Sequence, residues 1–405
     1  MTTQTSLVDQ SNGTRVRAIA MFLVLLASYA INAMDRQVFP LVAPEVRREY
    51  GLSLAAIGLL STIFTLGMAI AGLPTGFLLA RFSRKTVLLL GIAIFSAGTM
   101  LTIVSTGFSD MLVYRAATGI GEAMQLTVLL VIAANFFVEY RAAAFGAVNF
   151  SFGIGAIIGP TLGSVLLSPN RSWHVPMFVF GLLGFLAIAV VALTVRPWFS
   201  ETRRAVDVLT DLTGSPTLLN RNTVLLTVMS LIAGLVIYGY LGMYPTFLRE
   251  KLHYSSTATG TVMGSNGLGT LASVAGGWLG DRFSPRFLMS TAFLCTACLG
   301  YLLFHGPEAF ESRTILSFLW GLVVSGTIYV NLAGYHVKAV RSSLGSRASG
   351  IFVTSIYGAA AFAGYLMGWI ASHSGWMLAG DIQFCLLAIV AGGLALGLRH
   401  EQMSL

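Results

Sequence analysis

The sequence predicts an all-α polytopic membrane protein in which 12 transmembrane helices form two pseudo-symmetric six-helix bundles. Three observations support this fold class. Of the 405 residues, 56% are apolar and only 10% are charged, whereas about 25% of the residues in soluble domains are charged. The apolar residues gather in long continuous runs, and one ten-residue loop pattern occurs twice, half a chain length apart.

The apolar runs predict helices, because a helix needs about 20 residues to cross the hydrocarbon core of a bilayer. The predicted spans are 18–44, 54–80, 86–106, 110–137, 142–167, 174–196, 222–248, 256–280, 286–305, 312–337, 347–372 and 375–398. The predicted domains are an N-terminal tail (1–17), a first six-helix bundle (18–196), a linker with a short helix (197–221), a second six-helix bundle (222–398) and a C-terminal tail (399–405).

The positions of lysine and arginine predict the orientation of the chain. If both termini are cytoplasmic, 16 of the 24 basic residues fall in cytoplasmic segments, six fall in outer loops, and Arg36 and Arg115 remain inside spans. Cytoplasmic loops of membrane proteins carry such an excess. The net charge of +8 therefore needs no nucleic-acid partner, although it favours contact with anionic membrane lipids.

No motif predicts a metal site or an organic cofactor. Cys295 and Cys298 lie inside an apolar run, where both thiols share one face of a helix. Helix packing explains this pair better than redox chemistry. The six histidines lack the spacing of a metal site, and no nucleophile–base pair is recognisable, so an enzyme is not expected.

A ten-residue segment occurs once in each half. Residues 76–85 (GFLLARFSRK) and 277–286 (GWLGDRFSPR) align without gaps at an offset of 201 residues. The segment resembles the loop pattern G-x-L-x-D-R-x-x-[RP]-[RK] of the major facilitator superfamily, and the resemblance covers essentially the whole chain. It implies a monomer in which two bundles rock about a central site. The gating-loop residues that it implies are Gly76, Arg81, Arg84, Gly277, Asp281 and Arg282.

The first copy departs from the family pattern, because Ala80 stands where the family usually has aspartate. That difference implies that other contacts help to set the conformational balance. A glycine-rich stretch in the fifth span, Gly153 to Gly163, leaves two interpretations open. Its small residues and Pro160 suit close packing and a helix bend, and it also loosely resembles a pattern that the superfamily associates with antiporters, with Ser164 in place of the final glycine.

Two carboxylates and two guanidiniums lie inside the predicted spans, where one charge costs about 3 kcal/mol even on a lenient insertion scale. Asp35 and Arg36 fall in the outer half of the first span. Arg115 and Glu122 share a face of the fourth span, because seven residues make close to two helical turns, and Gln125 continues that face. Such charges in membranes are functional by default, yet two static ion pairs between helices would also explain them.

The patterns around these charges resemble those of two narrower groups. Residues 32–36 (NAMDR) and 115–123 (RAATGIGEA) are similar to segments of the Spinster-like transporters and of the organic anion:cation symporters. The resemblance implies that the four charges surround one water-filled cavity. It also implies that Asp35 and Glu122 serve in proton coupling, while the two arginines pair with them or with substrate. Ala33 departs from the symporters, which usually carry an aromatic residue there, and the runs Asp35 to Gln37 and Gly121 to Ala123 favour the bacterial Spinster-like group. We expect the protein in a bacterial inner membrane.

The four charges predict a way to couple protons to an anion. With both carboxylates ionised the cluster is neutral and has little attraction for an anion. A proton on Glu122 or Asp35 leaves one guanidinium without its partner, and that guanidinium can bind a substrate carboxylate in bidentate fashion. Each event favours the other by the same factor. We therefore expect proton-coupled symport of a small organic acid by alternating access, with Glu122 as the first candidate for the proton site.

The second half carries no clear charge at membrane depth. Its aromatic and amide side chains suit an amphipathic wall for a substrate with an apolar body, and packing between helices explains the same residues. The candidate substrate-binding residues are Arg36, Arg115, Gln125, Tyr238, Tyr244, Asn266, Tyr329, Asn331 and Tyr357. Two alternatives stay open. One is a proton-driven antiporter that exports an amphiphilic or drug-like compound or a lysolipid, and the other is a membrane receptor or scaffold that transports nothing.

Overall fold

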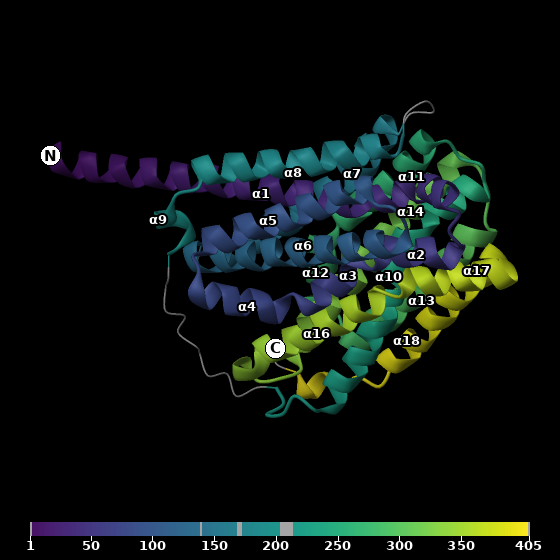
Figure 1. Cartoon of the computed structure of the whole chain (residues 1–405). Coiled ribbons are helices and arrows are strands. Elements are labelled where there is room, and N and C mark those ends of the chain that lie inside the picture. Colours follow the sequence, from purple (N-terminus) through teal and green to yellow (C-terminus); the bar gives the residue numbers. More distant parts are fainter. Residues whose placement is uncertain (1, 138–139, 168–171, 203–213, 404–405) are drawn as a thin grey trace.

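The computed structural model describes residues 2–137, 140–167, 172–202 and 214–403, which form helices joined by short connections (Figure 1). The α-helices are α1 (Thr2–Tyr50), α2 (Leu54–Thr62), α3 (Phe64–Ile70), α4 (Gly72–Arg81), α5 (Arg84–Leu101), α6 (Phe108–Phe136), α7 (Arg141–Leu166), α8 (His174–Thr194), α9 (Pro197–Ser200), α10 (Arg221–Glu250), α11 (Ser256–Thr270), α12 (Ser273–Arg282), α13 (Pro285–His305), α14 (Phe310–Trp320), α15 (Val330–Lys338), α16 (Gly345–Ala360), α17 (Ala363–Gly380) and α18 (Leu387–Ala395). Two π-helical segments, η2 (Gly321–Tyr329) and η4 (Asp381–Leu386), and three short 3-10 turns, η1 (Thr102–Val104), η3 (Ser342–Leu344) and η5 (His400–Gln402), complete the chain order.

Within the described ranges, nine helices are long and apolar enough to cross a membrane, and a bent pair, Leu54–Ile70 with Pro74–Arg81, would make a tenth. One of the nine, Ser342–Ala395, covers the last two predicted spans. Gly375, with a φ of +86°, interrupts the helix between them. The predicted span 256–280 consists of two shorter helices, α11 and α12. Each of the 12 predicted spans thus corresponds to a helix or to a helix broken at one or two points.

The first helix extends beyond its predicted span at both ends. It begins at Thr2, so most of the predicted N-terminal tail continues the helix and projects from the bundle (Figure 1). It ends at Tyr50, although Pro40 and Pro44 lie inside it. The predicted linker begins with the short helix α9, and its charged part from 203 to 213 lies outside the described residues.

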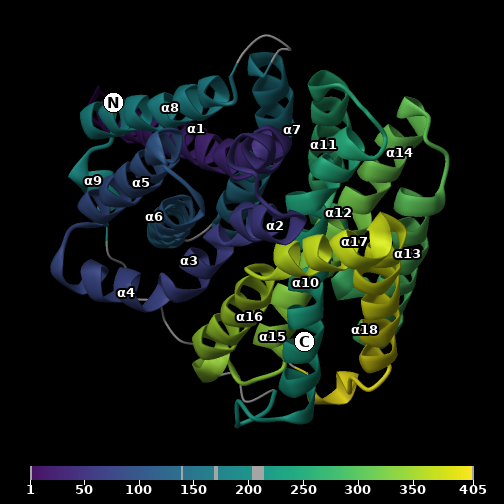
Figure 2. The same ribbon diagram turned by 45° about the vertical axis from the view of Figure 1, so that its right-hand side comes forward.

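The helices form two bundles that correspond to the two halves of the chain. Figure 2 shows α1 to α8 (purple to teal) on one side and α10 to α18 (green to yellow) on the other. Between the bundles, α7 packs on α11, α2 and α3 pack on α17 and α16, and α1 packs on α10. The charged stretch of α1 therefore lies at the boundary between the halves.

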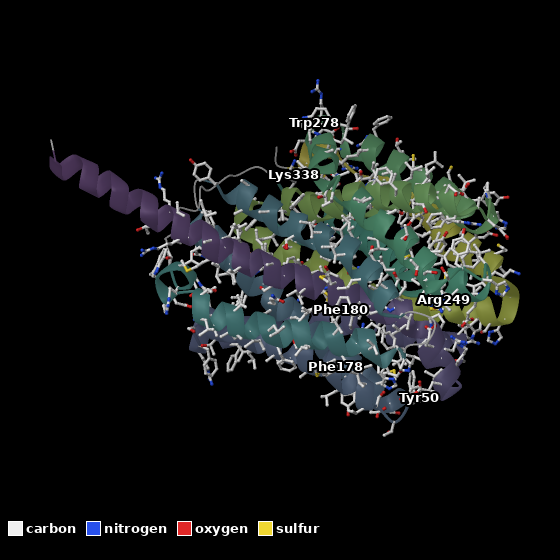
Figure 3. All side chains as sticks on the ribbon, turned by 90° about the horizontal axis from the view of Figure 1, so that it is seen from above. Tyr50, Phe178, Phe180, Arg249, Trp278 and Lys338 are labelled. Atoms are coloured by element: carbon white, nitrogen blue, oxygen red, sulfur yellow. The ribbon has the colours of Figure 1, made fainter. Side chains whose placement is uncertain are left out.

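Ion pairs join the halves at the end of the molecule remote from the N-terminus. Arg47 of α1 pairs with Glu250 of α10 at 2.7 Å, and Arg249 pairs with Glu45 at 2.5 Å. Figure 3 shows Arg249 toward this end, whereas Trp278 and Lys338 lie nearer to the projecting start of α1. We call these two ion pairs the end clamp.

A second link between the halves lies where two helices break. The Thr62 hydroxyl donates to the Ala361 carbonyl at 2.9 Å and accepts from the Gly364 amide at 3.3 Å. It therefore satisfies backbone groups that the break between α16 and α17 leaves free. The backbones approach closely here, since a Cβ on Gly364 would lie 2.0 Å from the Gly58 carbonyl oxygen.

A further hydrogen bond between the halves lies beside the end clamp. The Ser256 hydroxyl donates to the Leu167 carbonyl near the end clamp. In this structure the halves are thus joined by two ion pairs and a hydrogen bond at the end clamp.

Candidate functional site

Four charged side chains meet inside the N-terminal half. Asp35 and Arg36 come from α1, and Arg115 and Glu122 come from α6, which packs beside it. Their side chains are buried, with exposed fractions of 0% for three of them and 5% for Arg36. The fold thus brings the four predicted charges together, in this state with almost no exposure to solvent.

Arg36 and Glu122 form the direct ion pair of this cluster. Arg36 Nε lies 3.1 Å from Glu122 Oε2, but it donates its hydrogen bond to Asn32 Oδ1, also at 3.1 Å. Neither carboxylate oxygen of Glu122 accepts an aligned hydrogen bond from any described residue. Charge attraction therefore holds this pair, while the Nε–H points to the amide of Asn32.

Asp35 is held by a hydroxyl rather than by an arginine. The Thr99 Oγ1 atom, on α5, lies 2.9 Å from one carboxylate oxygen of Asp35 and 2.8 Å from the other. Because a hydroxyl carries one hydrogen, it donates to one of these oxygens at a time. Thr99 was absent from the predicted site.

Arg115 is the second guanidinium of the cluster, and it has no direct polar partner among the described residues. Its three nitrogen atoms are buried and make no hydrogen bond there. The guanidinium lies over the rings of Phe39 at 4.7 Å and Phe64 at 5.5 Å, and it interacts with the charges of Asp35 and Glu122 at longer range. Cation–π contacts compensate only part of the cost of burying free N–H groups, so this guanidinium is suited to receive an acceptor.

The C-terminal half adds phenol groups to the same region. Tyr238 of α10 and Tyr357 of α16 interact electrostatically with Arg36, and their rings lie 5.9 Å apart. The Tyr329 hydroxyl lies 3.0 Å from the Tyr357 hydroxyl. Two of the predicted substrate-binding tyrosines therefore lie near Arg36 across the boundary between the halves, and the third, Tyr329, bonds one of them.

A narrow pocket lies at this boundary. Its lining comes from both halves and includes Arg36, Gln37, Phe64, Tyr238 and Gly242. Arg36 Nη2 has no hydrogen-bond partner among the described residues. The pocket thus combines a cation, a phenol and apolar surface, in a space that in this structure has room for about one water molecule. In the described part of the chain, no group of three or more His, Cys, Asp or Glu could hold a metal ion.

Other predicted binding residues do not line this pocket. Gln125 accepts a hydrogen bond from Asn32 at 2.9 Å. Tyr244 stacks on Tyr240, at 4.8 Å between ring centroids, inside the C-terminal half. The Asn331 amide donates to two backbone carbonyls of its own half, and Asn266 lies where α11 crosses η2.

The gating loop of the N-terminal half is anchored by the start of the linker. Glu201 accepts hydrogen bonds at 3.0 Å from two backbone N–H groups at the start of α5. Arg84 donates to two backbone carbonyls at the end of α9 and just after it. Arg81 lies 4.2 Å over a phenylalanine ring, and Gly76 is exposed. A carboxylate from the linker thus lies beside the loop in which Ala80 replaces the family's aspartate.

The gating loop of the C-terminal half keeps its aspartate. Asp281 pairs with Lys338 at 2.7 Å, which joins α12 to α15. Arg282 lies 5.2 Å over the ring of Trp278, and Gly277 is half-buried beside α15. The two copies of one sequence pattern are therefore held by different partners.

Three comparisons relate the chain to known proteins. A model of the Major Facilitator Superfamily matches residues 25–364. The chain is 24% identical to protein spinster homolog 1 of Xenopus laevis over 355 residues, which cover 78% of this chain and 67% of that protein. It is also 24% identical to the hexuronate transporter of Bacillus subtilis (strain 168) over 334 residues, which cover 77% of this chain and 78% of that protein. Several other relatives are matched over less than half of their own length.

A solved structure shares the fold. It is a bacterial homolog of the human lysosomal transporter Spinster in an inward-facing and occupied conformation, with a TM-score of 0.75 and 16% sequence identity. The match covers 92% of this chain and 95% of that chain. The pairing of two helical bundles seen here is therefore the arrangement of a known transporter fold.

Proposed function

The chain belongs to the major facilitator superfamily, and on this premise we propose that it is a proton-coupled symporter of a small organic anion. It is a multi-pass integral membrane transporter, and its relatives are transporters rather than enzymes. Alternating access, in which the two bundles rock about a central site, is the working principle of such folds. The proposal concerns what is carried and what drives it.

One observation supports the proposal above all others, namely the buried cluster of two carboxylates and two guanidiniums at the boundary between the halves. A purely structural pair needs matched partners, because the cost of burying each ion is large. Here Arg115 has no direct partner among the described residues, and the oxygens of Glu122 receive no aligned donor. The cluster is therefore better suited to change its charge than to lock two helices.

Coupling follows from the charge count. With Asp35 and Glu122 ionised, the cluster has no net charge. A proton on Glu122 makes the cluster positive beside the pocket that Arg36 lines, and an anion is then attracted there. Because the coupling free energy is reciprocal, the bound anion favours the proton to the same extent. Asp35 is the second candidate for a proton.

We propose that the substrate is a carboxylate with a small body. The pocket offers one guanidinium together with a phenol and apolar side chains, and arginine is suited to bidentate contact with a carboxylate. The name of the hexuronate transporter of Bacillus subtilis points to a sugar acid as the substrate of that relative, so sugar acids are the first class to test. We further propose a monomer in a bacterial inner membrane, with both termini cytoplasmic and no organic cofactor.

The test is proton flux in proteoliposomes that contain a pH-sensitive dye. D-glucuronate, gluconate, lactate, benzoate and a lysolipid are added outside, one at a time, with protein-free vesicles as the control for passive leak. Acidification of the lumen above that leak on addition of one acid is the expected result. No response to any acid, in vesicles where the protein is folded and correctly reconstituted, would count against symport.

A second candidate function is proton-driven export of an amphiphile. The observation that favours it is the aromatic wall of the C-terminal half, where Tyr238 lines the pocket and Tyr357 packs against Tyr238. In the same assay an exporter responds to the lysolipid or to a drug-like cation and stays silent with the acids. The two functions therefore give opposite patterns with one set of vesicles.

A further inference from the structure

A chain of hydrogen bonds runs along α1 and α6 beside the ion pair. Ser28, Asn32 and Arg36 are four residues apart and share one face of α1, and Gln125 reaches them from α6. We propose that Ser28 and Gln125 are positioning residues, which fix the amide of Asn32 and so keep the Nε–H of Arg36 away from Glu122. This inference rests on the proposed role of Glu122 as a proton site.

Every bond in the chain donates in the same direction, away from the guanidinium. Arg36 Nε donates to Asn32 Oδ1 at 3.1 Å, Asn32 Nδ2 donates to Gln125 Oε1 at 2.9 Å, and Gln125 Nε2 donates to Ser28 Oγ at 3.1 Å. The Ser28 hydroxyl then donates to the Leu25 carbonyl at 2.7 Å. All four side chains are buried, so water does not compete for these bonds.

The direction is set at the far end of the chain, because a backbone carbonyl can only accept. Since Ser28 donates its one hydrogen to that carbonyl, it can only accept from Gln125. The amide nitrogen of Gln125 must therefore face Ser28, and its oxygen must face Asn32. That oxygen, together with the backbone carbonyl of Glu122 at 3.3 Å, requires Nδ2 of Asn32 on this side and so presents Oδ1 to Arg36.

The consequence concerns the charge of Glu122. A carboxylate that accepts an aligned hydrogen bond from a guanidinium holds its negative charge more firmly. Here Asn32 takes the Nε–H although Glu122 Oε2 lies at the same distance of 3.1 Å. The chain thus leaves Glu122 paired with Arg36 chiefly by charge and free to accept a proton. Arg36 also stays in place when that proton arrives, because its bond to Asn32 does not depend on the charge of Glu122.

Other ionisable groups also act on Glu122. Those that interact with it are Asp35, Arg36 and Tyr29 on α1, Arg115 on α6 and Tyr238 on α10. None of them takes part in the hydrogen bonds between Asn32, Gln125 and Ser28. Changes at Gln125 or Ser28 therefore reach Glu122 only through the orientation of Asn32 and Arg36.

The experiment compares Gln125→Met and Ser28→Ala with the control Ser96→Ala. Ser96 is also fully buried, but the one bond of its hydroxyl among the described residues goes to the Ile92 carbonyl of its own helix. The first readout needs no substrate, namely the guanidinium Nε–H signal of Arg36 in ¹⁵N-arginine-labelled protein, assigned by its loss in Arg36→Lys. The second readout is the pH at which proton-driven uptake of D-glucuronate is half-maximal.

Both variants should move the Arg36 signal, because the Nε–H turns from an amide to a carboxylate. Half-maximal uptake should then require a pH lower by about one unit, the change expected for one charge-assisted hydrogen bond to Glu122. Ser96→Ala should change neither readout. Asn32→Leu removes the acceptor itself, so it should give the largest change in the Arg36 signal and in the pH of half-maximal uptake. An Arg36 signal that stays at its wild-type position in folded Gln125→Met and Ser28→Ala would overturn the proposal. If the wild type carries no acid at all, the proposed function fails while the Arg36 signal still decides the positioning role.

Discussion

The two halves of the molecule share an architecture but differ in what they carry at membrane depth. At the 201-residue offset of the repeated loop, the four charged positions of the N-terminal half correspond to Val236, Ile237, Leu316 and Val323. The symmetry of the fold is therefore not a symmetry of chemistry. The charges that we propose for proton coupling are concentrated in one half, and the other half supplies a phenol group and apolar surface to the shared pocket.

Two buried arginines illustrate this difference. Arg313 of the C-terminal half is 1% exposed and donates to the carbonyls of Leu302, Leu303 and Gly306, where α13 ends. It satisfies carbonyl groups that a helix end leaves free. Arg115 is equally buried but has no hydrogen-bond partner among the described residues. Burial alone does not distinguish the two arginines, whereas their hydrogen-bond partners do, and this contrast is the basis of the role that we propose for Arg115.

The largest effect is expected from Arg36→Ala, which leaves Glu122 as a buried charge without its direct partner. Breaking a buried pair in this way costs about 3–5 kcal/mol of the free energy of unfolding. We expect reduced thermal stability in detergent and no proton-driven uptake. The double variant Arg36→Met with Glu122→Leu should regain most of the stability but none of the uptake. If the double variant is as unstable as the single one, the pair is not the source of the loss.

The next effect separates the coupling from the transport cycle. Glu122→Gln keeps the shape of the side chain and removes its charge, so the cluster stays positive whether or not protons are supplied. Accumulation driven by a pH gradient should disappear, whereas exchange of substrate between the two sides of a vesicle should partly remain. The measurement is uptake of labelled D-glucuronate with and without a gradient, and with preloaded vesicles. Equal loss of both activities would contradict a proton role for Glu122.

A smaller effect should distinguish the two buried arginines. Arg313→Met removes charge-assisted hydrogen bonds to the end of α13 and should lower the free energy of unfolding by about 2–3 kcal/mol. Arg115→Met removes no hydrogen bond among the described residues, so its stability should change little while its affinity for an anion falls by about tenfold or more. Denaturant unfolding and binding of an acid compared with its neutral amide would check this contrast. If the two variants lose stability and anion affinity to the same extent, the contrast between the two arginines, and with it the distinction between the halves, is wrong.

Much of the architecture could be predicted from the sequence, because an apolar run has few alternatives to a spanning helix. The positions at which spanning helices are interrupted could not be predicted so well. Nothing in the sequence around Ile63 or Ala361 shows that α2 and α16 end there. At Ala361 the backbone groups of the break bond the Thr62 hydroxyl of the opposite half, which no local pattern reveals. Similarly, the continuation of α1 through Pro40 depends on packing against neighbouring helices rather than on local preference.

The four charges of the site could be predicted because charges are rare inside spans. Thr99 and Ser28 could not, since hydroxyl residues are common in such helices and usually bond a carbonyl of the preceding turn. A signal did exist for Ser28, because it is four residues from Asn32 and eight from Arg36 on the same helix face. The aromatic residues were ambiguous for a physical reason. Tyr238 at the pocket and Tyr244 in the aromatic stack are six residues apart on one helix, and only the packing of the neighbouring helices decides which of them lines the pocket.

The smallest effect is expected from a change at Tyr238, and it tests whether this residue of the C-terminal half contacts the substrate. Tyr238→Phe removes one hydroxyl group that faces Arg36 and keeps the ring that packs against Phe64. If the halves divide the work as proposed, the KM for D-glucuronate should rise about fivefold, the value of one neutral hydrogen bond, while the pH dependence of uptake stays that of the wild type. Tyr301→Phe, which removes an exposed hydroxyl on α13, is the matched control and should leave KM unchanged. A shift in the pH dependence of Tyr238→Phe would instead assign part of the proton coupling to the C-terminal half, because only a group linked to the proton can move that profile.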